Sequence, residues 1–215
     1  QLIGWLDGAQ TNHFRVGNRV HGDHEWCIWD ISCADAERTP WIDAAHHDRF
    51  ILHGAGYSRR YEGGLGREKH GIFSDDYMAT EVLTGHPAMV DLTMSRDVVC
   101  KYWLLHDVGR QLALKKGIVS VEYAGGDLHR QHVQWAPCGE VWVNRGSTDW
   151  NVAGVTLPPY GFLVHTSTVA SIARRDGLIV EESRSPDEIY VNGRKPAGAK
   201  DGECRETDFG EIVTS

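Results

Sequence analysis

Apolar and polar residues alternate with a period of two along the C-terminal half of the chain, which is the pattern of half-buried β-strands. The alternation runs through residues 118–123, 128–135 and 140–144, which are separated by GGD and APCG turns. Residues 169–173 and 178–182 flank the hairpin signal RRDG, and residues 188–192 predict a last strand. We therefore expect residues 118–194 to form an antiparallel β-sandwich with no helix longer than a turn or two.

Residues 141–164, VWVNRGSTDWNVAGVTLPPYGFLV, are the most informative stretch of this half. They predict a strand, a turn, a second strand, a Pro-Pro corner and a third strand. We expect Trp142 and Val164 to face the core, and Asn144 and Arg145 to form a turn. A core position for Trp142 means that Trp142→Ala would cost about 3 to 5 kcal/mol of stability.

The N-terminal half has a different pattern, in which short apolar runs alternate with helical signals. Three apolar runs predict strands: residues 2–6, 49–53 and 88–92. Residues 8–19 predict a polar loop. A first helix begins after the cap Ser74 and stops at Gly85, and residues 95–116 carry the best helical signals in the chain. This rhythm is typical of an α/β unit, so the expected fold class is α+β and β-rich, with an α/β segment over residues 1–117.

Composition narrows the function classes. The chain has 215 residues, 41% of them hydrophobic, and 22 basic against 30 acidic residues give a net charge of -8. That charge leaves no broad cationic face for nucleic acid, and no apolar run approaches the roughly 20 residues that cross a bilayer. The chain opens at Gln1 directly on a strand-like run, so we expect a mature or truncated piece of a longer protein, with a secreted or periplasmic location favoured and the oligomeric state open.

The cysteines and the C-terminal tail add little. Five cysteines without a CxxC pair indicate neither a zinc ribbon nor a complete disulfide framework, and a Cys27–Cys33 bridge stays open beside free thiols. Residues 195–215, rich in glycine, proline and charge, predict a loosely ordered tail in which residues 209–213 could add an edge strand.

Carboxylates near short apolar runs are the most suggestive chemistry. Asp7 follows the first run, Glu25 lies in the motif HGDHEW, and Glu62 lies in a glycine-rich loop. Glycoside hydrolysis needs two carboxyl groups, about 5 to 5.5 Å apart for retention or 6.5 to 9.5 Å for inversion. Glu25 is the preferred acid because Trp26 beside it offers an apolar wall, which raises the pKa of a carboxyl. The expected catalytic residues are therefore Glu25, Asp7 and Glu62.

Polar residues around the same glycine-rich segment complete the expected site. The candidate substrate-binding residues are Trp26, His53, Tyr57, Arg59, Asp75 and Asp76. Arg59 could grip an anionic group such as a uronate, and the two aspartates are equally explained by a helix N-terminus. The histidines leave a metal-dependent hydrolase as an alternative, but HxxHE matches neither HExxH nor the HxH followed by Glu of a cupin metal site. We expect neither a metal nor another cofactor.

Three segments carry a resemblance to a known group of proteins. GYSRRYEGG (residues 56–64), SDDYMATEVLTGHPAMVD (residues 74–91) and VNRGSTDWNVAGVTLPPYGFLV (residues 143–164) resemble the C-terminal part of large bacterial glycoside-hydrolase-like proteins. The resemblance implies the last strands of a (β/α)8 TIM barrel followed by an antiparallel β-sandwich. It also implies hydrolysis of an oligo- or polysaccharide at the C-terminal ends of barrel strands, where Asp7, Glu25 and His53 would fall.

Two non-catalytic alternatives remain. A carbohydrate-binding module would use the sandwich, with Trp135, Trp142 and Trp150 as sugar platforms, although alternation places some of these in the core. A purely structural β-domain is the other.

Overall fold

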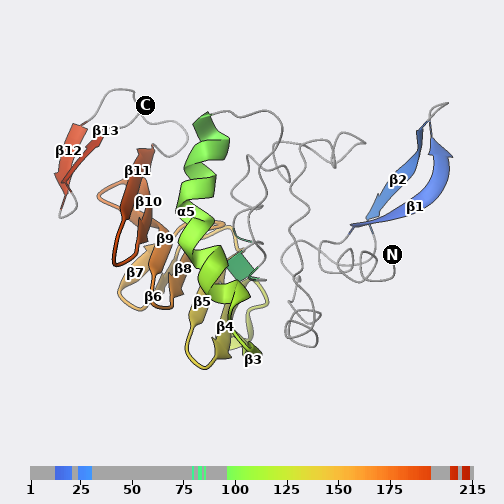
Figure 1. Ribbon diagram of the computed structural model, residues 1–215, viewed down its shortest axis with the longest axis horizontal. Coiled ribbons are helices and arrows are strands. Elements are labelled where there is room, and N and C mark those ends of the chain that lie inside the picture. Colours follow the sequence, from blue (N-terminus) through green and yellow to red (C-terminus); the bar gives the residue numbers. More distant parts are fainter. Residues whose placement is uncertain are drawn as a thin grey trace.

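One helix and one large antiparallel sheet make up most of the described structure. The computed structural model of the protein describes residues 13–20, 24–30, 79, 82–83, 85, 96–194, 204–207 and 210–213. Helix α5 (Arg96–Ala113) lies along a nine-stranded sheet (Figure 1). Two hairpins are not paired with that sheet: β1 (His13–Val20) with β2 (His24–Asp30), and β12 (Cys204–Thr207) with β13 (Gly210–Val213). The described region is therefore β-rich, as predicted.

The nine strands follow one another closely along the chain. They are β3 (Gly117–Tyr123), β4 (Arg130–Ala136), β5 (Glu140–Asn144), β6 (Trp150–Val152), β7 (Val155–Leu157), β8 (Phe162–His165), β9 (Val169–Arg175), β10 (Leu178–Arg184) and β11 (Ile189–Arg194). The main order is β11-β10-β9-β8-β5-β4-β3, and every pair is antiparallel. The β6–β7 hairpin lies between β5 and β8 in sequence, and β7 also pairs with β9.

The face of the sheet toward α5 forms the core. Cross-strand partners place Val133, Val141, Val164 and Ala170 in one row over β4, β5, β8 and β9, and all four are fully buried. The helix contributes a stripe at helical spacing: Leu104, Leu105, Val108 and Leu112. Period-two strands and a period-3.6 helix each bury one face, so they meet in a single apolar layer. A sandwich would need a second sheet here, and in the described residues α5 covers this face instead.

Trp135 is the largest side chain of that layer, and its ring packs against Gly85. Ala79, Val82 and Leu83 are helical and buried in the same core, and Gly85 follows them with φ 68°. This is the left-handed conformation typical of a helix C-terminus, so the predicted stop at Gly85 is confirmed. A Cβ added at Gly85 would lie 2.7 Å from Cη2 of Trp135.

Several element boundaries match the sequence analysis. Residues 118–192 contain strands and turns, with η3 (Ala124–Gly126) the longest helical segment among them, and this expectation is confirmed. The long helix runs from Arg96 to Ala113 rather than to residue 116. It ends early because Lys116 N–H donates to the carbonyl of Ala136, 3.1 Å away, and so enters the sheet.

The edge strand expected within residues 209–213 is present as β13, which pairs with β12. Two other expectations were wrong. Residues 8–19 were predicted as loop, but His13 begins β1, with Phe14 opposite Trp29 and Val16 opposite Cys27. Trp142 does not face the core: Val141 and Val143 on either side of it do, and alternation turns Trp142 to the opposite face, where it is half-buried.

The C-terminal strands of the sheet bury two neighbouring carboxylates on opposite faces. Glu182 pairs with Nη1 of Arg175 at 2.7 Å and also with Arg184. Glu181 accepts hydrogen bonds from Arg194 Nε and Asn192 Nδ2, both at 2.9 Å. A buried carboxylate is tolerated only when it is paired in this way, so both groups are explained by structure alone.

Candidate functional site

Most of the predicted site residues lie outside the described residues. These are Asp7, His53, Tyr57, Arg59, Glu62, Asp75 and Asp76. Glu25 and Trp26 lie on strand β2, with Trp26 opposite Gly17 on β1, and only the backbone of this hairpin is described. The shared cleft of Asp7, Glu25, His53 and Glu62 therefore stays a prediction.

A different group of aromatic and ionisable side chains gathers on the face of the nine-stranded sheet opposite α5, which we call the outer face. Register places Glu122 of β3 opposite His132 of β4, and His132 opposite Trp142 of β5. Glu140 of β5 and His165 of β8 are cross-strand partners on the same face. Glu140 lies two residues before Trp142 along β5. We call these five residues the outer-face cluster.

Two imidazole rings hold the Trp142 indole in place. The His132 ring is parallel to it, with ring centroids 4.6 Å apart and planes inclined by only 3°. The His165 ring meets it edge-on at 5.5 Å and 77°. Stacked and edge-to-face contacts at these separations are favourable, so the indole has a fixed orientation on the sheet.

Two carboxylates lie on either side of His132. Nδ1 of His132 is 3.8 Å from an oxygen of Glu122, and Nε2 is 3.7 Å from an oxygen of Glu140. The His132 side chain is only 16% exposed, whereas Glu122 and Glu140 are 64% and 44% exposed. Nε2 of His132 is buried without a hydrogen bond in the described structure. The cluster thus combines a buried imidazole with two acceptor groups that reach solvent.

A cleft of about 500 Å³ adjoins this cluster and shares Glu140 and His165 with it. Gln134, Cys138 and Thr166 also line the cleft, and Cys138 is an exposed free thiol with Lys115 Nζ at 3.9 Å from its sulfur. The cleft is therefore lined by amide, hydroxyl, carboxylate and imidazole groups, and it adjoins the cluster that holds the Trp142 ring. A small polar ligand would find both hydrogen-bonding groups and apolar surface here.

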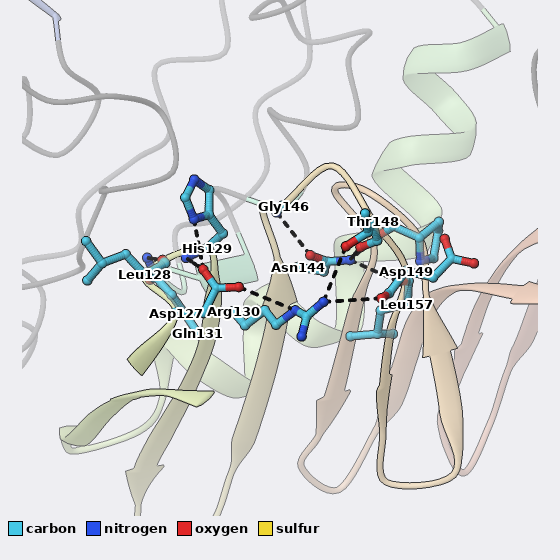
Figure 2. Close-up of polar contacts among 11 residues, drawn as sticks. Asp127, Leu128, His129, Arg130, Gln131, Asn144, Gly146, Thr148, Asp149 and Leu157 are labelled. Atoms are coloured by element: carbon cyan, nitrogen blue, oxygen red, sulfur yellow. Dashed lines mark hydrogen bonds and ion pairs between the residues drawn. The ribbon is translucent and has the colours of Figure 1, made fainter. Parts of the chain in front are cut away.

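Polar contacts connect the loops at one end of β4 and β5, as Figure 2 shows. Asn144 is fully buried, and its Nδ2 donates to the carbonyl oxygens of Thr148, Leu157 and Pro158 at 2.8, 3.0 and 3.1 Å. Its Oδ1 accepts from Gly146 N–H at 3.0 Å. One amide thus closes the connection from β5 to β7. The turn expected at Asn144 and Arg145 is displaced, because Asn144 is the last residue of β5 and the chain bends at residues 146–148.

A second set of contacts in the same loops joins the start of β4 to the β5–β6 loop. Arg130 contacts Asp127, Thr148 and the carbonyl of Asp149 (Figure 2). Asp127 accepts from the backbone N–H of His129 at 3.0 Å and pairs with the His129 ring at 2.9 Å. The backbone hydrogen bond, followed by the ring contact, lowers the pKa of Asp127 from its ordinary value of 3.8. These polar groups bond to one another, as the members of a structural hydrogen-bond network do.

Sequence analysis missed four members of the outer-face cluster: Glu122, His132, Glu140 and His165. The signal was present in RQHVQWA and EVWVN, where His132 and Trp142 alternate with buried valines. The alternation of apolar and polar residues does not give the order of the strands in the sheet. That order places β3, β4, β5 and β8 side by side.

The comparisons with known proteins give no further guidance. No protein-family model, no curated protein and no solved structure matches the chain. In the part of the chain that the structure describes, no group of three or more histidine, cysteine or acidic residues is arranged to hold a metal ion. Among the same residues, no helix is long and apolar enough to span a bilayer.

Proposed function

We propose that the nine-stranded sheet is the saccharide-binding part of a carbohydrate-active protein, and that the sugar contacts the outer-face cluster. The observation that carries this proposal is the fixed, half-buried Trp142 indole among ionisable and polar side chains. A sugar ring offers C–H faces that pack on aromatic surface and hydroxyls that bond to carboxylate, imidazole and amide groups. A surface that combines an aromatic ring with polar side chains can bind both the C–H faces and the hydroxyls of a sugar.

Charge narrows the class of saccharide. Glu122 and Glu140 both reach solvent beside His132, and the whole chain carries a net charge of -8. An anionic glycan would meet like charges, which weaken association and slow encounter. We therefore expect a neutral or amino sugar in preference to a uronate or a sulfated glycan.

The outer face is assigned binding rather than hydrolysis because of the surroundings of its carboxylates. A glycosidase acid lies against an apolar wall that keeps it protonated, and Glu122 and Glu140 are too exposed to have one. Their role in the proposal is to accept hydrogen bonds from sugar hydroxyls.

The finer proposal joins this binding part to glycoside hydrolysis by Glu25, Asp7 and Glu62. It is supported by the placing of Asp7 after an apolar run and of Glu25 beside Trp26, and by the resemblance to bacterial glycoside-hydrolase-like proteins. The resemblance implies a barrel-like segment before residue 117 and a sandwich after it. Asp7 and His53 would then lie at strand ends of that barrel, whereas Glu25 lies near the start of β2 in an antiparallel hairpin.

Binding of a panel of neutral and charged polysaccharides, measured by calorimetry on the intact chain, tests the binding proposal. We expect Trp142→Ala to weaken the best ligand by at least about fivefold, as for an aromatic group central to an interface. Trp150→Ala is the matched control, because Trp150 lies on the separate β6–β7 hairpin. Binding that survives Trp142→Ala, or that is lost only in Trp150→Ala, would contradict the proposal. Circular dichroism of each variant shows that the fold is kept.

A further inference from the structure

A second cleft lies on the opposite side of the sheet, between helix α5 and the start of β11. It has a volume of about 380 Å³ and is lined by Trp103, Asp107, Ser183, Glu188, Ile189 and Tyr190. Two aromatic and two acidic residues thus line one small space. Neither the outer-face cluster nor the predicted carboxylate site uses any of these residues.

The helix presents one aromatic wall of this cleft. Trp103 and Asp107 are four residues apart on α5, so they lie one above the other on the same side of the helix. Trp103 is 44% exposed, which is unusual for the largest apolar side chain. The rings of Tyr102 and His106 lie 6.1 and 6.0 Å from it and limit its freedom. Tyr190 and Ile189 come from the facing strand.

The charge on the lining has one sign. Asp107 contacts Arg110 at 3.7 Å, but that arginine is exposed and does not line the cleft. The backbone N–H of Glu188 is held by Ser185 Oγ at 3.1 Å, and its carboxylate has no ion pair among the described residues. No arginine or lysine of the described chain lines the cleft. The space therefore offers two negative groups beside two π-faces.

We propose that this cleft binds an organic ammonium group. A cation over an aromatic face is attracted by the ring quadrupole, and the attraction strengthens when carboxylates share the site and water is displaced. Trp103 and Tyr190 supply the faces, and Asp107 and Glu188 supply the counter-charge. The proposal does not rest on the proposed saccharide site, because the two surfaces lie on opposite faces of the sheet.

Calorimetric titration of the intact chain with matched pairs of probes separates charge from shape. Choline is compared with its neutral isostere 3,3-dimethylbutan-1-ol, and D-glucosamine with D-glucose. We expect the charged member of at least one pair to bind and its neutral partner to bind at least tenfold more weakly. The pair that binds distinguishes an alkylammonium ligand from an amino sugar. Equal binding of both members of each pair, or no binding of choline and glucosamine at millimolar concentrations, would overturn the proposal.

Variants then locate the site. We expect Trp103→Leu, which keeps apolar bulk but removes the π-face, to weaken binding of the charged probe roughly three- to thirtyfold. Trp103→Phe should lie between Leu and the original residue. Asp107→Asn and Glu188→Gln should each weaken binding severalfold, whereas Asp176→Asn, an equally conservative loss of charge in the exposed β9–β10 turn, should not. An equal effect of Asp176→Asn would mean attraction to the net charge alone and would refute the cleft.

Discussion

At the scale of single residues, position relative to the sheet decides what a tryptophan does. Trp135 on β4 is 2% exposed and packs with the core valines, whereas Trp142 on β5 lies on the outer face against His132. The same type of side chain is thus part of the core in one place and part of the half-exposed outer face in the other. Size and hydrophobicity alone would have assigned both to the core.

This contrast gives a prediction about stability. Trp135→Ala removes a fully buried indole and leaves a cavity between β4, α5 and Gly85, so it should cost about 3 to 5 kcal/mol of the free energy of unfolding. Trp142→Ala should cost clearly less because its ring is half-buried on the outer face. Urea unfolding of both variants measures the difference. Equal losses would mean that something packs on the outer face as tightly as α5 packs on the core.

Asn144 gives a second prediction at this scale. Its buried amide satisfies three carbonyl oxygens and one N–H, so Asn144→Ala should cost roughly 2 to 4 kcal/mol because several buried polar groups lose their partner. Asn144→Asp should be worse, because a carboxylate would face carbonyl oxygens. Asn151→Ala, which removes an exposed bond to Thr156, is the control and should change the unfolding free energy little. A loss from Asn151→Ala as large as that from Asn144→Ala would count against this account.

At the scale of elements, a glycine fixes how the segment before α5 meets the sheet. Gly85 has φ 68° and leaves no room for a Cβ beside Trp135. Gly85→Ala therefore combines left-handed backbone strain with overpacking and should cost about 2 to 4 kcal/mol. Gly177→Ala, in the β9–β10 turn, has φ 78° and open space around it, so only the backbone strain of about 1 kcal/mol applies. Thermal unfolding of both variants should show a larger loss for Gly85→Ala, and the reverse order would contradict this packing.

The elements themselves were largely predictable from local pattern. Alternation located β3, β4, β5, β9, β10 and β11, and caps with a 3.6-residue stripe located α5. The phase of β5 was misjudged because Trp142 outweighed its smaller neighbours Val141 and Val143. Strand β1 was missed because only Phe14 and Val16 alternate within an otherwise polar segment. The residue composition of β1 does not predict a strand, and β1 is a strand because its backbone pairs with β2.

The order of the strands in the sheet could not be predicted from the local sequence pattern. Consecutive strands pair as expected for β3, β4 and β5, but β8 returns to pair with β5 across the inserted β6–β7 hairpin. That pairing brings His165 to Trp142 and creates the outer-face cluster. Contacts between residues 23 positions apart depend on register and packing over the whole sheet, which no short window contains.

At the scale of the whole molecule, the sheet separates the two proposed ligand surfaces. The outer-face cluster lies on one side of it, and the cleft between α5 and β11 lies on the side of the helix. A saccharide at one and an ammonium group at the other would not compete for space. The proposed hydrolytic carboxylates belong to residues before the helix, so in this proposal binding and turnover should be separable by substitution.

That separation leads to the last prediction. Glu25→Gln keeps the shape of the side chain and removes the titrating proton, so it should abolish release of reducing sugar while leaving polysaccharide affinity unchanged. Trp142→Ala should instead raise KM and change kcat little, because it removes contacts made equally to substrate and transition state. Reducing-sugar assays beside binding titrations on the same preparations measure both. A Glu25→Gln chain that turns over normally would exclude Glu25 as the acid. If the unsubstituted chain binds the polysaccharide but releases no sugar, hydrolysis by this chain is wrong and the saccharide-binding role of the sheet stands alone.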